Sequence, residues 1–361
     1  MTAATASMAP GSPRTRRRRR SAGELTRIAV LTTAFAAILV AFLSPLVYSG
    51  LVSIKTPEQI SQLDAPLLPS DPETFDYQGK TYPVYFVPMP DGTTRTLALV
   101  KKGRLQSDFV DPANAAAGPI TWVGSWRTLQ QPYVVSPHLE NYGKVWTLIN
   151  FPRALINTIL LAAIGTIGTV LSCTLVAYGF ARFRFPGRGL LFTILLATIF
   201  LPAAVTLIPT YTIFVKIGWI GTWLPLLVPA FFANAYDVFL LRQYLLTIPR
   251  DLDEAAAIDG ASSFRILRSV ILPQAWPVIV AVSIFTFVYS WNDFFGPLIY
   301  LAGHDEIQPL QVVLAHFNGI YYENPAYIQA GNIMTLLIPV ILFMMFQRVF
   351  VKGIVITGVE K

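Results

Sequence analysis

LINTILLAAIGTIGTVLSCTLVAYGF, residues 155–180, is an apolar run without one charged residue. A helix needs about 20 such residues to cross the hydrocarbon core of a bilayer. Five further runs are long and apolar enough to do the same, at residues 28–49, 189–211, 219–241, 277–300 and 328–350. The sequence therefore predicts an all-α polytopic membrane protein with six transmembrane helices.

The composition agrees with a membrane location. Of the 361 residues, 54% are hydrophobic and only 13% are charged, with a mean hydropathy of +0.54. A soluble domain of this size could not cover so much apolar surface with so few charges. The net charge of +7 comes from short basic runs without interleaved aromatic residues, which argues against a nucleic-acid partner. One cysteine, Cys173, and three scattered histidines do not form the spacing of a metal site.

The distribution of Lys and Arg predicts how the chain crosses the membrane. With a cytoplasmic N-terminus, the short inside segments 1–27, 181–188, 242–276 and 351–361 hold nearly all the basic residues of the short connections, including RTRRRRR at 14–20. The short outside connections hold Lys216 and no basic residue between 301 and 327. Because short basic segments stay in the cytoplasm, both termini are expected inside.

The first apolar run is expected to be an uncleaved anchor. Its basic lead would suit a signal peptide, but the run is too long for the apolar region of such a signal and lacks a clear cleavage site. The expected organisation is a cytoplasmic basic tail (1–27), a first transmembrane helix (28–51), an extracytoplasmic insertion (52–150), a transmembrane core (151–350) and a cytoplasmic tail (351–361).

The insertion at 52–150 is expected to contain a small β-rich module. It is polar and rich in proline, and two β-rich runs, TYPVYFVP and TTRTLALVKK, flank Asp91-Gly92. Such a pair of residues between two β-rich runs is typical of a hairpin.

The longest cytoplasmic connection, residues 242–276, predicts two short helices. Acidic residues between Asp251 and Glu254 favour the start of the first helix, and Ala255, Ala256 and Ala257 leave its surface open to close approach. Gly260 is expected to end this helix in a left-handed conformation. Ser262 or Ser263 would then cap the second helix.

The second helix carries an apolar stripe, and Pro273 is expected to end it. The stripe consists of Phe264, Leu267, Val270 and Ile271. A stripe of this kind outside the membrane must be buried. The residues leave two possibilities open: packing on the transmembrane helices of the same chain, or packing on a partner.

The spacing of this segment resembles a known pattern. Glu254-Ala255-Ala256, Gly260 and Leu272-Pro273 match the EAA loop of binding-protein-dependent ABC importer permeases, EAA–x3–G–x9–I–x–LP, with Val270 in place of Ile. LENYGKVW (139–146), YSWNDFFGPLI (289–299) and the tail QRVFVKGIVITGVEK also resemble the MalG-type permeases of carbohydrate importers. The likeness covers residues 135–361 and the first span, while the 52–135 module departs from compact MalG-like chains.

The resemblance implies a mechanism and a set of partners. The EAA loop would seat in a cleft of an ABC ATPase, and ATP-driven closure of two ATPase subunits would switch the permease between inward-facing and outward-facing states. The implied docking residues are Glu254, Ala255, Ala256, Asp259, Gly260, Phe264, Leu267, Val270, Leu272 and Pro273. The other implied partners are a second, MalF-like permease subunit and an extracytoplasmic solute-binding protein. ATP and Mg would be bound by the ATPase subunits, with no cofactor on this chain.

Polar side chains within the spans are candidates for a substrate pathway. They are Tyr289, Trp291, Asn292 and Asp293 in the fifth run, with Asn157, Asn234 and Asn332 elsewhere. Aromatic faces can stack on a pyranose ring, and amide or carboxyl groups can bond its hydroxyls, so a sugar or a related polyol is the expected solute. Interfacial aromatic belts and hydrogen bonds between helices are the alternative roles of these residues.

Two other classes of membrane protein fit the sequence less well. A secondary carrier would explain the spans, but the two halves show no convincing repeat. A membrane-embedded enzyme would need a cluster of His or carboxylate residues at one membrane face, and the sequence shows none. An ATP-driven importer permease for a non-sugar solute also remains open.

Overall fold

The computed structural model describes residues 22–62, 65–319 and 322–356. The basic run 14–20 and residues 357–361 of the expected cytoplasmic tail lie outside the described residues. The chain divides into two compact units, residues 1–48 and 49–361. The first unit holds most of α1 (Ala22–Ser53), whose stretch Thr26–Ser53 is long and apolar enough to cross a membrane.

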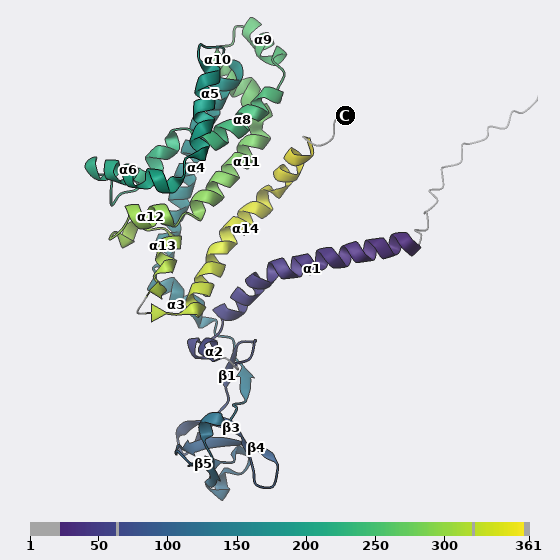
Figure 1. Cartoon of the computed structure of the whole chain (residues 1–361), viewed down its shortest axis with the longest axis vertical. Coiled ribbons are helices and arrows are strands. Elements are labelled where there is room, and N and C mark those ends of the chain that lie inside the picture. Colours follow the sequence, from purple (N-terminus) through teal and green to yellow (C-terminus); the bar gives the residue numbers. More distant parts are fainter. Residues whose placement is uncertain (1–21, 63–64, 320–321, 357–361) are drawn as a thin grey trace, which may run out of the picture. The chain divides into compact units, whose positions relative to one another are not determined.

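The second unit is built around one long helix, α4 (Phe151–Arg182). Helices α8 (Ala235–Thr247) and α11 (Leu272–Trp291) pack against α4, and α14 (Pro325–Ile356) packs against α11 (Figure 1). Small residues along α4 allow these close approaches. Ala162, Cys173, Ala177 and Ala181 are fully buried.

Shorter helices complete this unit. They are α3 (Glu140–Leu148), α5 (Arg188–Ala197), η3 (Thr198–Phe200), α6 (Ala203–Lys216), α7 (Leu224–Leu227), η4 (Val228–Phe231), α9 (Asp251–Ile258), α10 (Ser263–Ile266), η5 (Leu267–Ile271), α12 (Phe295–Tyr300), η6 (Asp305–Ile307) and α13 (Leu310–Ala315). Two short strands, β8 (Asn318–Gly319) and β9 (Tyr322–Glu323), precede α14.

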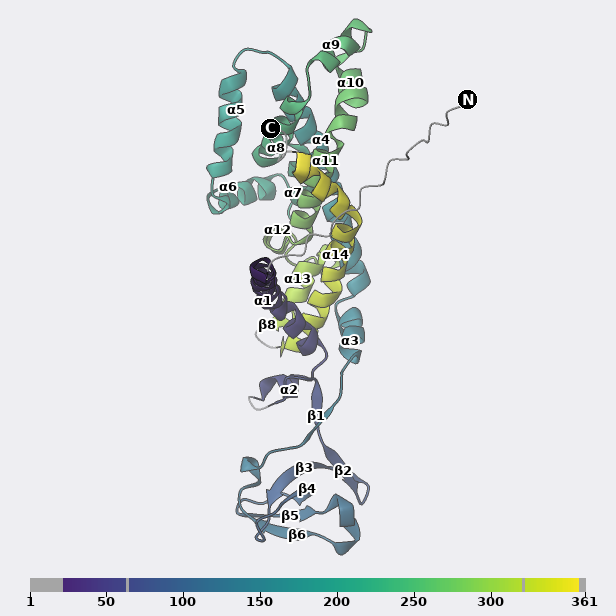
Figure 2. The ribbon, with the colours of Figure 1, turned by 90° about the vertical axis from the view of Figure 1, so that its right-hand side faces the viewer.

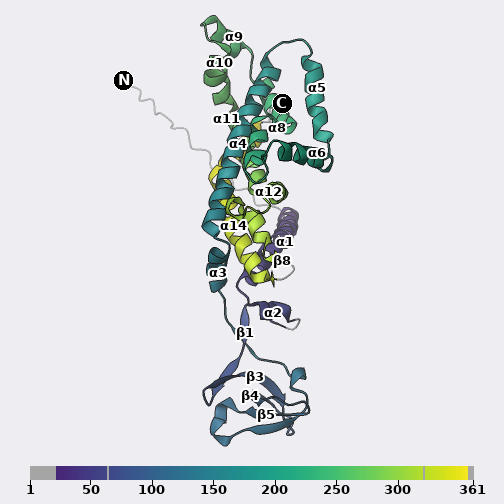
Figure 3. The same cartoon turned by 90° about the vertical axis from the view of Figure 1, so that its left-hand side faces the viewer.

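Within the described residues, five helical segments are long and apolar enough to span a membrane. They are Thr26–Ser53, Phe151–Arg182, Leu224–Thr247, Ser263–Trp291 and Pro325–Gln347. A sixth span is reached only if Arg188–Phe200 and Ala204–Lys216 are counted together, and these two are bent by 100° (Figure 3). The expected mostly helical membrane protein is confirmed, whereas the expected count of six remains a prediction.

The bend occurs where the sequence places Pro202. The residue before it, Leu201, has an extended backbone (φ −75°, ψ 116°), because a following proline ring disfavours the helical conformation. Pro209, by contrast, lies inside α6 without ending it. The span expected over 189–211 is therefore interrupted at Pro202.

The fourth and fifth spans lie at different positions from those predicted. The fourth begins at Leu224 instead of 219 and continues to Thr247. The fifth begins at Ser263 instead of 277 and ends at Trp291, after which α12 forms a separate short helix. Hydropathy alone missed this because the polar residues at 263–274 continue the same helix without a break.

The insertion contains the expected β-rich module. Five antiparallel strands pair in the order β2 (Thr74–Tyr77), β3 (Lys80–Pro88), β4 (Thr94–Lys101), β5 (Gln106–Val110) and β6 (Ile120–Val123) (Figure 2). The expected hairpin at Asp91-Gly92 is confirmed: it joins β3 to β4, Gly92 has φ +80°, and Asp91 Oδ1 accepts a hydrogen bond from Thr93 N at 2.9 Å.

Alternating side chains of this sheet bury a compact core. It contains Tyr85, Val87, Leu97, Leu99 and Phe109. Two short helices, η1 (Pro112–Ala117) and η2 (Trp126–Thr128), follow β5 and β6. Because each strand presents every second residue to one face, nine residues of β3 and eight of β4 suffice to form this core.

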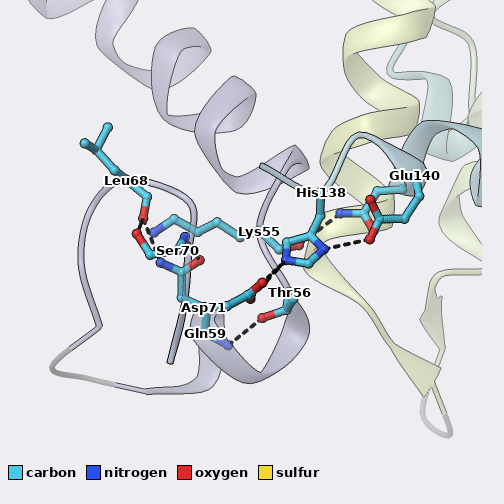
Figure 4. A network of polar contacts seen from close by, with 9 residues as sticks. Lys55, Thr56, Gln59, Leu68, Ser70, Asp71, His138 and Glu140 are labelled. Carbon is cyan, nitrogen blue, oxygen red and sulfur yellow. Dashed lines mark hydrogen bonds and ion pairs between the residues drawn. The ribbon is translucent and has the colours of Figure 1, made fainter. Parts of the chain in front are cut away.

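A two-stranded ribbon connects the module to the helices. Strand β1 (Ser70–Pro72) pairs with β7 (Tyr133–Val135), so both connections to the sheet run side by side. Near this ribbon, His138 lies between two carboxylates, with Nε2 at 2.9 Å from Asp71 and Nδ1 at 2.6 Å from Glu140 (Figure 4).

Further polar contacts order the chain around α2 (Pro57–Ser61) at the same place. The Asn141 amide donates to the carbonyls of Ser53 (3.0 Å) and Lys55 (2.9 Å). Gln59 donates to Leu68 O at 2.7 Å and accepts from Ser70 N at 3.1 Å (Figure 4). These contacts tie the segments on both sides of the module to the start of α3.

Candidate functional site

The segment at residues 242–276, predicted to hold two short helices, does so. The first is α9, which begins after Arg250 and carries Asp251, Asp253 and Glu254 in its first turn. Carboxylates at this position are favourable because the helix dipole is positive there. Glu254, Ala255 and Ala257 are exposed, whereas Asp253 and Ala256 are partly buried.

Gly260 forms the turn between the two helices, as predicted. It has φ +79°, and its N–H donates to Ala257 O at 3.0 Å. A residue with a side chain is strained in this left-handed conformation. Ser262 then caps α10, where its Oγ accepts from Arg265 N at 3.4 Å.

The second helix does not end at Pro273, contrary to prediction. α10, η5 and α11 form one continuous span from Ser263 to Trp291. η5 is a π turn in which Leu272 N–H bonds Leu267 O, five residues earlier. Because Pro273 has no N–H and its ring crowds the preceding turn, the wider π turn accommodates it without breaking the helix. Residues 250–273, called the coupling segment after the role that their resemblance implies, are therefore continuous with a helix long and apolar enough to span a membrane.

The apolar stripe of the second helix is buried against the same chain. Ile266, Leu267 and Ile271 lie in a cluster with Ala177 and Tyr178 of α4. The same cluster also includes Leu241, Leu245 and Ile248 of the α8 region. Val270 is half-buried at its edge. Of the two possibilities that the sequence left open, packing on the chain's own helices therefore applies to this face.

Phe264 was predicted to belong to the buried stripe, and this is wrong. Its side chain is 67% exposed, because Ile266 takes the inward position instead. Ile258 at the end of α9 is 86% exposed, and Leu252 is exposed as well. The carboxylates of Glu254 and Asp259 are exposed beside them. The coupling segment thus presents apolar and acidic side chains to its surroundings.

The coupling segment is anchored to the end of α4 through residues that the sequence did not single out. Arg182 Nε lies 2.8 Å from Asp253 Oδ2, and Arg182 also donates to Ile248 O at 3.0 Å. Tyr178 donates to Ser263 O at 3.1 Å, and Arg250 donates to Ala181 O at 3.3 Å. An arginine in the last turn of an apolar helix, with an acidic helix start in another connection between apolar runs, was the available signal.

A hollow of about 540 Å³ gathers several of the predicted pathway residues. Tyr289 and Asn234 line it. Thr169, Tyr236, Asp237, Phe285 and Thr286 complete the lining. Asn234 caps α8 by accepting from Asp237 N (2.9 Å) and donates to the Asp237 carboxylate (2.7 Å). A second hollow of about 610 Å³, lined by Tyr244 and Thr247, shares Phe285 with the first. Together they run along α8 and α11.

The other pathway candidates of the fifth run lie apart from this hollow. Trp291 is only 1% exposed and belongs to an apolar cluster with Phe151 and Leu310. Asn292 is exposed and donates to Val288 O at 2.8 Å. Asp293 is partly buried, accepts from Gly296 N at 3.3 Å, and lines a small cavity of about 40 Å³ with Ser290.

The remaining two candidates differ in burial. Asn157 is buried on α4, and its amide donates to the carbonyls of Glu306 and Gln308, both at 3.0 Å. It therefore holds the connection before α13 against α4. Asn332 on α14 is exposed.

A larger hollow, of about 760 Å³, lies at the other end of α4. Its rim is polar, with Arg153, Asp305, Glu306 and His316. The sequence did not predict it, because its charged residues come from positions more than 150 apart along the chain.

The sequence and the fold are similar to those of known proteins. The chain is 32% identical to the osmoprotective compounds uptake permease protein GgtD of Synechocystis over 67% of this chain and 82% of that protein. It is 31% identical to the arabinooligosaccharides transport system permease protein AraQ of Halalkalibacterium halodurans over 56% of this chain and 72% of that protein.

The fold is also found in a crystal structure of a bacterial ABC transporter involved in the import of alginate. The two chains superpose with a TM-score of 0.63 over 91% of this chain and 98% of the other, at 19% identity. Residues 173–356, just over half of the chain, match the model of a protein family. The chain belongs to this family, the inner membrane components of binding-protein-dependent transport systems.

Proposed function

We propose that this chain is the permease subunit of an ATP-driven importer that moves a sugar or related polyol into the cell. The observation that carries the proposal is the coupling segment: a helix–Gly–helix unit continuous with a membrane span, in a member of a transport family. In this proposal both termini are cytoplasmic, as the distribution of Lys and Arg favours.

The ATPase would dock on the exposed side of the coupling segment. Ile258 and Phe264 offer apolar contacts, while Glu254 and Asp259 offer carboxylates for basic residues of the partner. Exposed apolar side chains beside polar ones are typical of an interaction surface. ATP and Mg would bind to the two ATPase subunits, and ATP-driven closure of those subunits would displace the segment.

The solute would cross along the face formed by α8 and α11, against a second permease subunit. Tyr289, Tyr236 and Phe285 provide aromatic faces for a sugar ring, and Asn234 and Thr169 provide hydrogen-bonding groups. The name of the relative AraQ supports an oligosaccharide, and that of GgtD supports a small osmoprotective compound as the second candidate.

An extracytoplasmic solute-binding protein would deliver the solute, with the β module as one of its contacts. At one end of the sheet, Lys102 and Arg127 lie 5.2 and 5.0 Å from the ring centre of Trp126. Leu105, in the turn between β4 and β5, is highly exposed, and its carbonyl accepts from Gly124 N at 2.7 Å. Basic and apolar groups gathered in this way suit an acidic protein surface.

Substitutions on the docking surface test the proposal. Ile258→Asp with Phe264→Asp would place charges on exposed apolar positions, so the chain should insert and fold normally. The ATPase should no longer co-purify, and ATP-dependent uptake into proteoliposomes should fall about tenfold or more. Leu67→Asp, at a comparably exposed leucine before β1 that belongs to neither proposed contact surface, is the matched control.

The same proteoliposomes separate the importer from a secondary carrier. Uptake should stop when ATP is withheld and a proton gradient is maintained. Uptake that persists under those conditions, or an ATPase that still binds the double variant with normal affinity, would contradict the proposed function.

A further inference from the structure

Helix α9, the first helix of the coupling segment, is weakly attached to the rest of the chain. Along α9, from Asp251 to Ile258, every side chain is exposed except those of Asp253 and Ala256. Ala256 packs at the edge of the apolar cluster and has one methyl group to offer. Asp253 is therefore the strongest candidate for a specific attachment of α9 to the membrane-spanning helices.

Its partner is the guanidinium of Arg182, in the last turn of α4. The Arg182 Nε and Asp253 Oδ2 atoms are 2.8 Å apart, and the two side chains are 6% and 20% exposed. A charge that is removed from water to this extent is strongly unfavourable unless it keeps its opposite partner. Burial raises the pKa of the Asp253 carboxyl, and the Arg182 and Arg250 guanidinium groups oppose that rise.

The pair is close but incompletely hydrogen-bonded. Within the described residues, neither Arg182 Nε nor Asp253 Oδ1 has a hydrogen-bonding partner of good geometry, although both atoms are buried. A buried polar group in this condition is unfavourable, so the pair stabilises this position of α9 less than a fully hydrogen-bonded pair would. The ion pair thus holds α9 in place without locking it.

Helix α10, the second helix of the coupling segment, is connected to the transmembrane helices in a different way. It continues directly into α11 through the π turn, so its displacement would move α11 without any side-chain contact. Helix α9 does not continue as one helix into a membrane span, because the turn at Gly260 separates it from α10. Its direct attachment to the end of α4 is the Arg182–Asp253 pair, beside which Arg250 donates to Ala181 O.

Helix α4 is suited to pass such a movement onward. It is 32 residues long, about 48 Å at 1.5 Å per residue. Thr169, in its middle, lines the hollow proposed for the solute, and Asn157 and Thr158 near its start hold the segment 306–310. One rigid helix therefore connects the coupling segment, the hollow and the opposite end of the unit.

We propose that the Arg182–Asp253 ion pair is the joint through which an ATPase subunit, on displacing α9, moves α4. Arg182 and Asp253 are positioning residues: they touch neither the solute nor ATP. The inference rests on the proposed function and adds a second path of coupling beside the continuous helix of α10 and α11. Loss of the joint leaves the ATPase docked and active but weakens the link between ATP hydrolysis and uptake.

Charge exchange tests this joint in the assembled importer. Arg182→Glu and Asp253→Arg should each lower the solute taken up per ATP hydrolysed by about tenfold, because each leaves two like charges in contact. The ATPase should still co-purify with both variants. The double variant Arg182→Glu/Asp253→Arg restores opposite charges and should recover most of the ratio of uptake to hydrolysis.

Matched controls and a milder variant complete the design. Arg184→Glu and Asp251→Arg make the same charge changes at exposed neighbouring positions and should leave the ratio unchanged. If a single reversal fails to fold, as judged by its thermal unfolding in detergent, Arg182→Lys keeps the charge with a shorter reach and should give an intermediate ratio.

The outcomes distinguish this inference from the proposed function. If wild-type uptake does not depend on ATP, the proposed function is wrong. If wild-type uptake depends on ATP but the single reversals keep a normal ratio of uptake to hydrolysis, the proposed role of the ion pair is wrong, while the proposed function stands. A folded double variant whose ratio of uptake to hydrolysis does not recover would equally contradict the proposed role of the ion pair.

Discussion

His138 shows how one side chain can hold two parts of the chain together. It lies near the β1–β7 ribbon and contacts Asp71 on one side and Glu140 on the other. The hydrogen bond to Glu140 is the largest cause that raises the pKa of His138; burial opposes it, and Asp71 adds to the rise. The protonated imidazole is thus favoured in the folded state.

A raised histidine pKa makes stability depend on pH in a defined direction. The contribution of His138 is complete below the unfolded value of ~6.5 and is lost as the pH rises through the higher folded value. We expect the purified full-length chain to unfold at a lower temperature at pH 8 than at pH 6, and His138→Gln to reduce this difference. An identical pH dependence in the variant would show that His138 does not titrate in this way.

Residue type alone did not distinguish pathway residues from structural ones. Asn157 and Trp291 were both pathway candidates, yet Asn157 donates to two backbone carbonyls and Trp291 lies in an apolar cluster. Tyr289 and Asn234, by contrast, meet at one hollow although they are 55 positions apart. Amide and aromatic groups suit both roles, so only their neighbours decide between them.

At the scale of elements, the turn at Gly260 is the clearest case of a local sequence that determines local structure. Its φ of +79° is a conformation that glycine adopts without strain. No atom lies within 4 Å of the position that a Cβ would take, so an added methyl group meets strain in the backbone but no clash.

Two substitutions at Gly260 are expected to differ sharply. Gly260→Ala should cost about 1–2 kcal/mol locally and reduce uptake mildly. Gly260→Pro cannot adopt the required φ and loses the hydrogen bond to Ala257, so ATP-coupled uptake should be abolished while the chain remains in the membrane. Gly189→Ala, at a helical glycine with open space, is the control. Normal uptake by Gly260→Pro would exclude this turn from coupling.

Two prolines in this chain affect their helices in different ways. Pro202 bends the third run sharply, whereas Pro273 lies within a continuous helix. The same missing N–H acts at both positions. The difference is that residues around Pro273 pack on α4 and α8, so the cluster keeps the helix together through a π turn.

At the scale of the whole molecule, the β module is separable in principle from the helices. Its two connections meet at the β1–β7 ribbon, where Glu73 N donates to Pro132 O at 2.9 Å. A short Gly-rich turn in place of residues 74–131 could therefore close the ribbon while preserving the contacts of His138 and Asn141 at its base.

We expect this shortened chain to insert into the membrane and to retain its ATPase. Its affinity for the solute-binding protein should fall, since the proposed basic contact surface is removed. The double variant Lys102→Glu/Arg127→Glu should reproduce that loss in the full chain, and Arg95→Glu, near the opposite turn of β4, should not. Unchanged affinity in the shortened chain, with intact assembly of the complex, would remove the module from this role.

The sequence by itself determined the features that depend on local physics. Long uncharged runs predicted a helical membrane protein, Asp91-Gly92 predicted a hairpin, and Gly260 with a following serine predicted the turn of the coupling segment. Each follows from insertion energetics, from backbone preference or from a hydrogen bond to the next few residues.

Only the tertiary structure decided which side chains of the coupling segment are buried and which charged residues pair with them. Ile266 displaced Phe264 from the buried face because the cluster of α4 and α8 offers space to that side of the helix. Arg182 meets Asp253 across 71 positions of sequence, which no pattern of spacing could reveal. Burial and charge pairing are properties of neighbours in space, and the chain acquires those neighbours only when its helices pack.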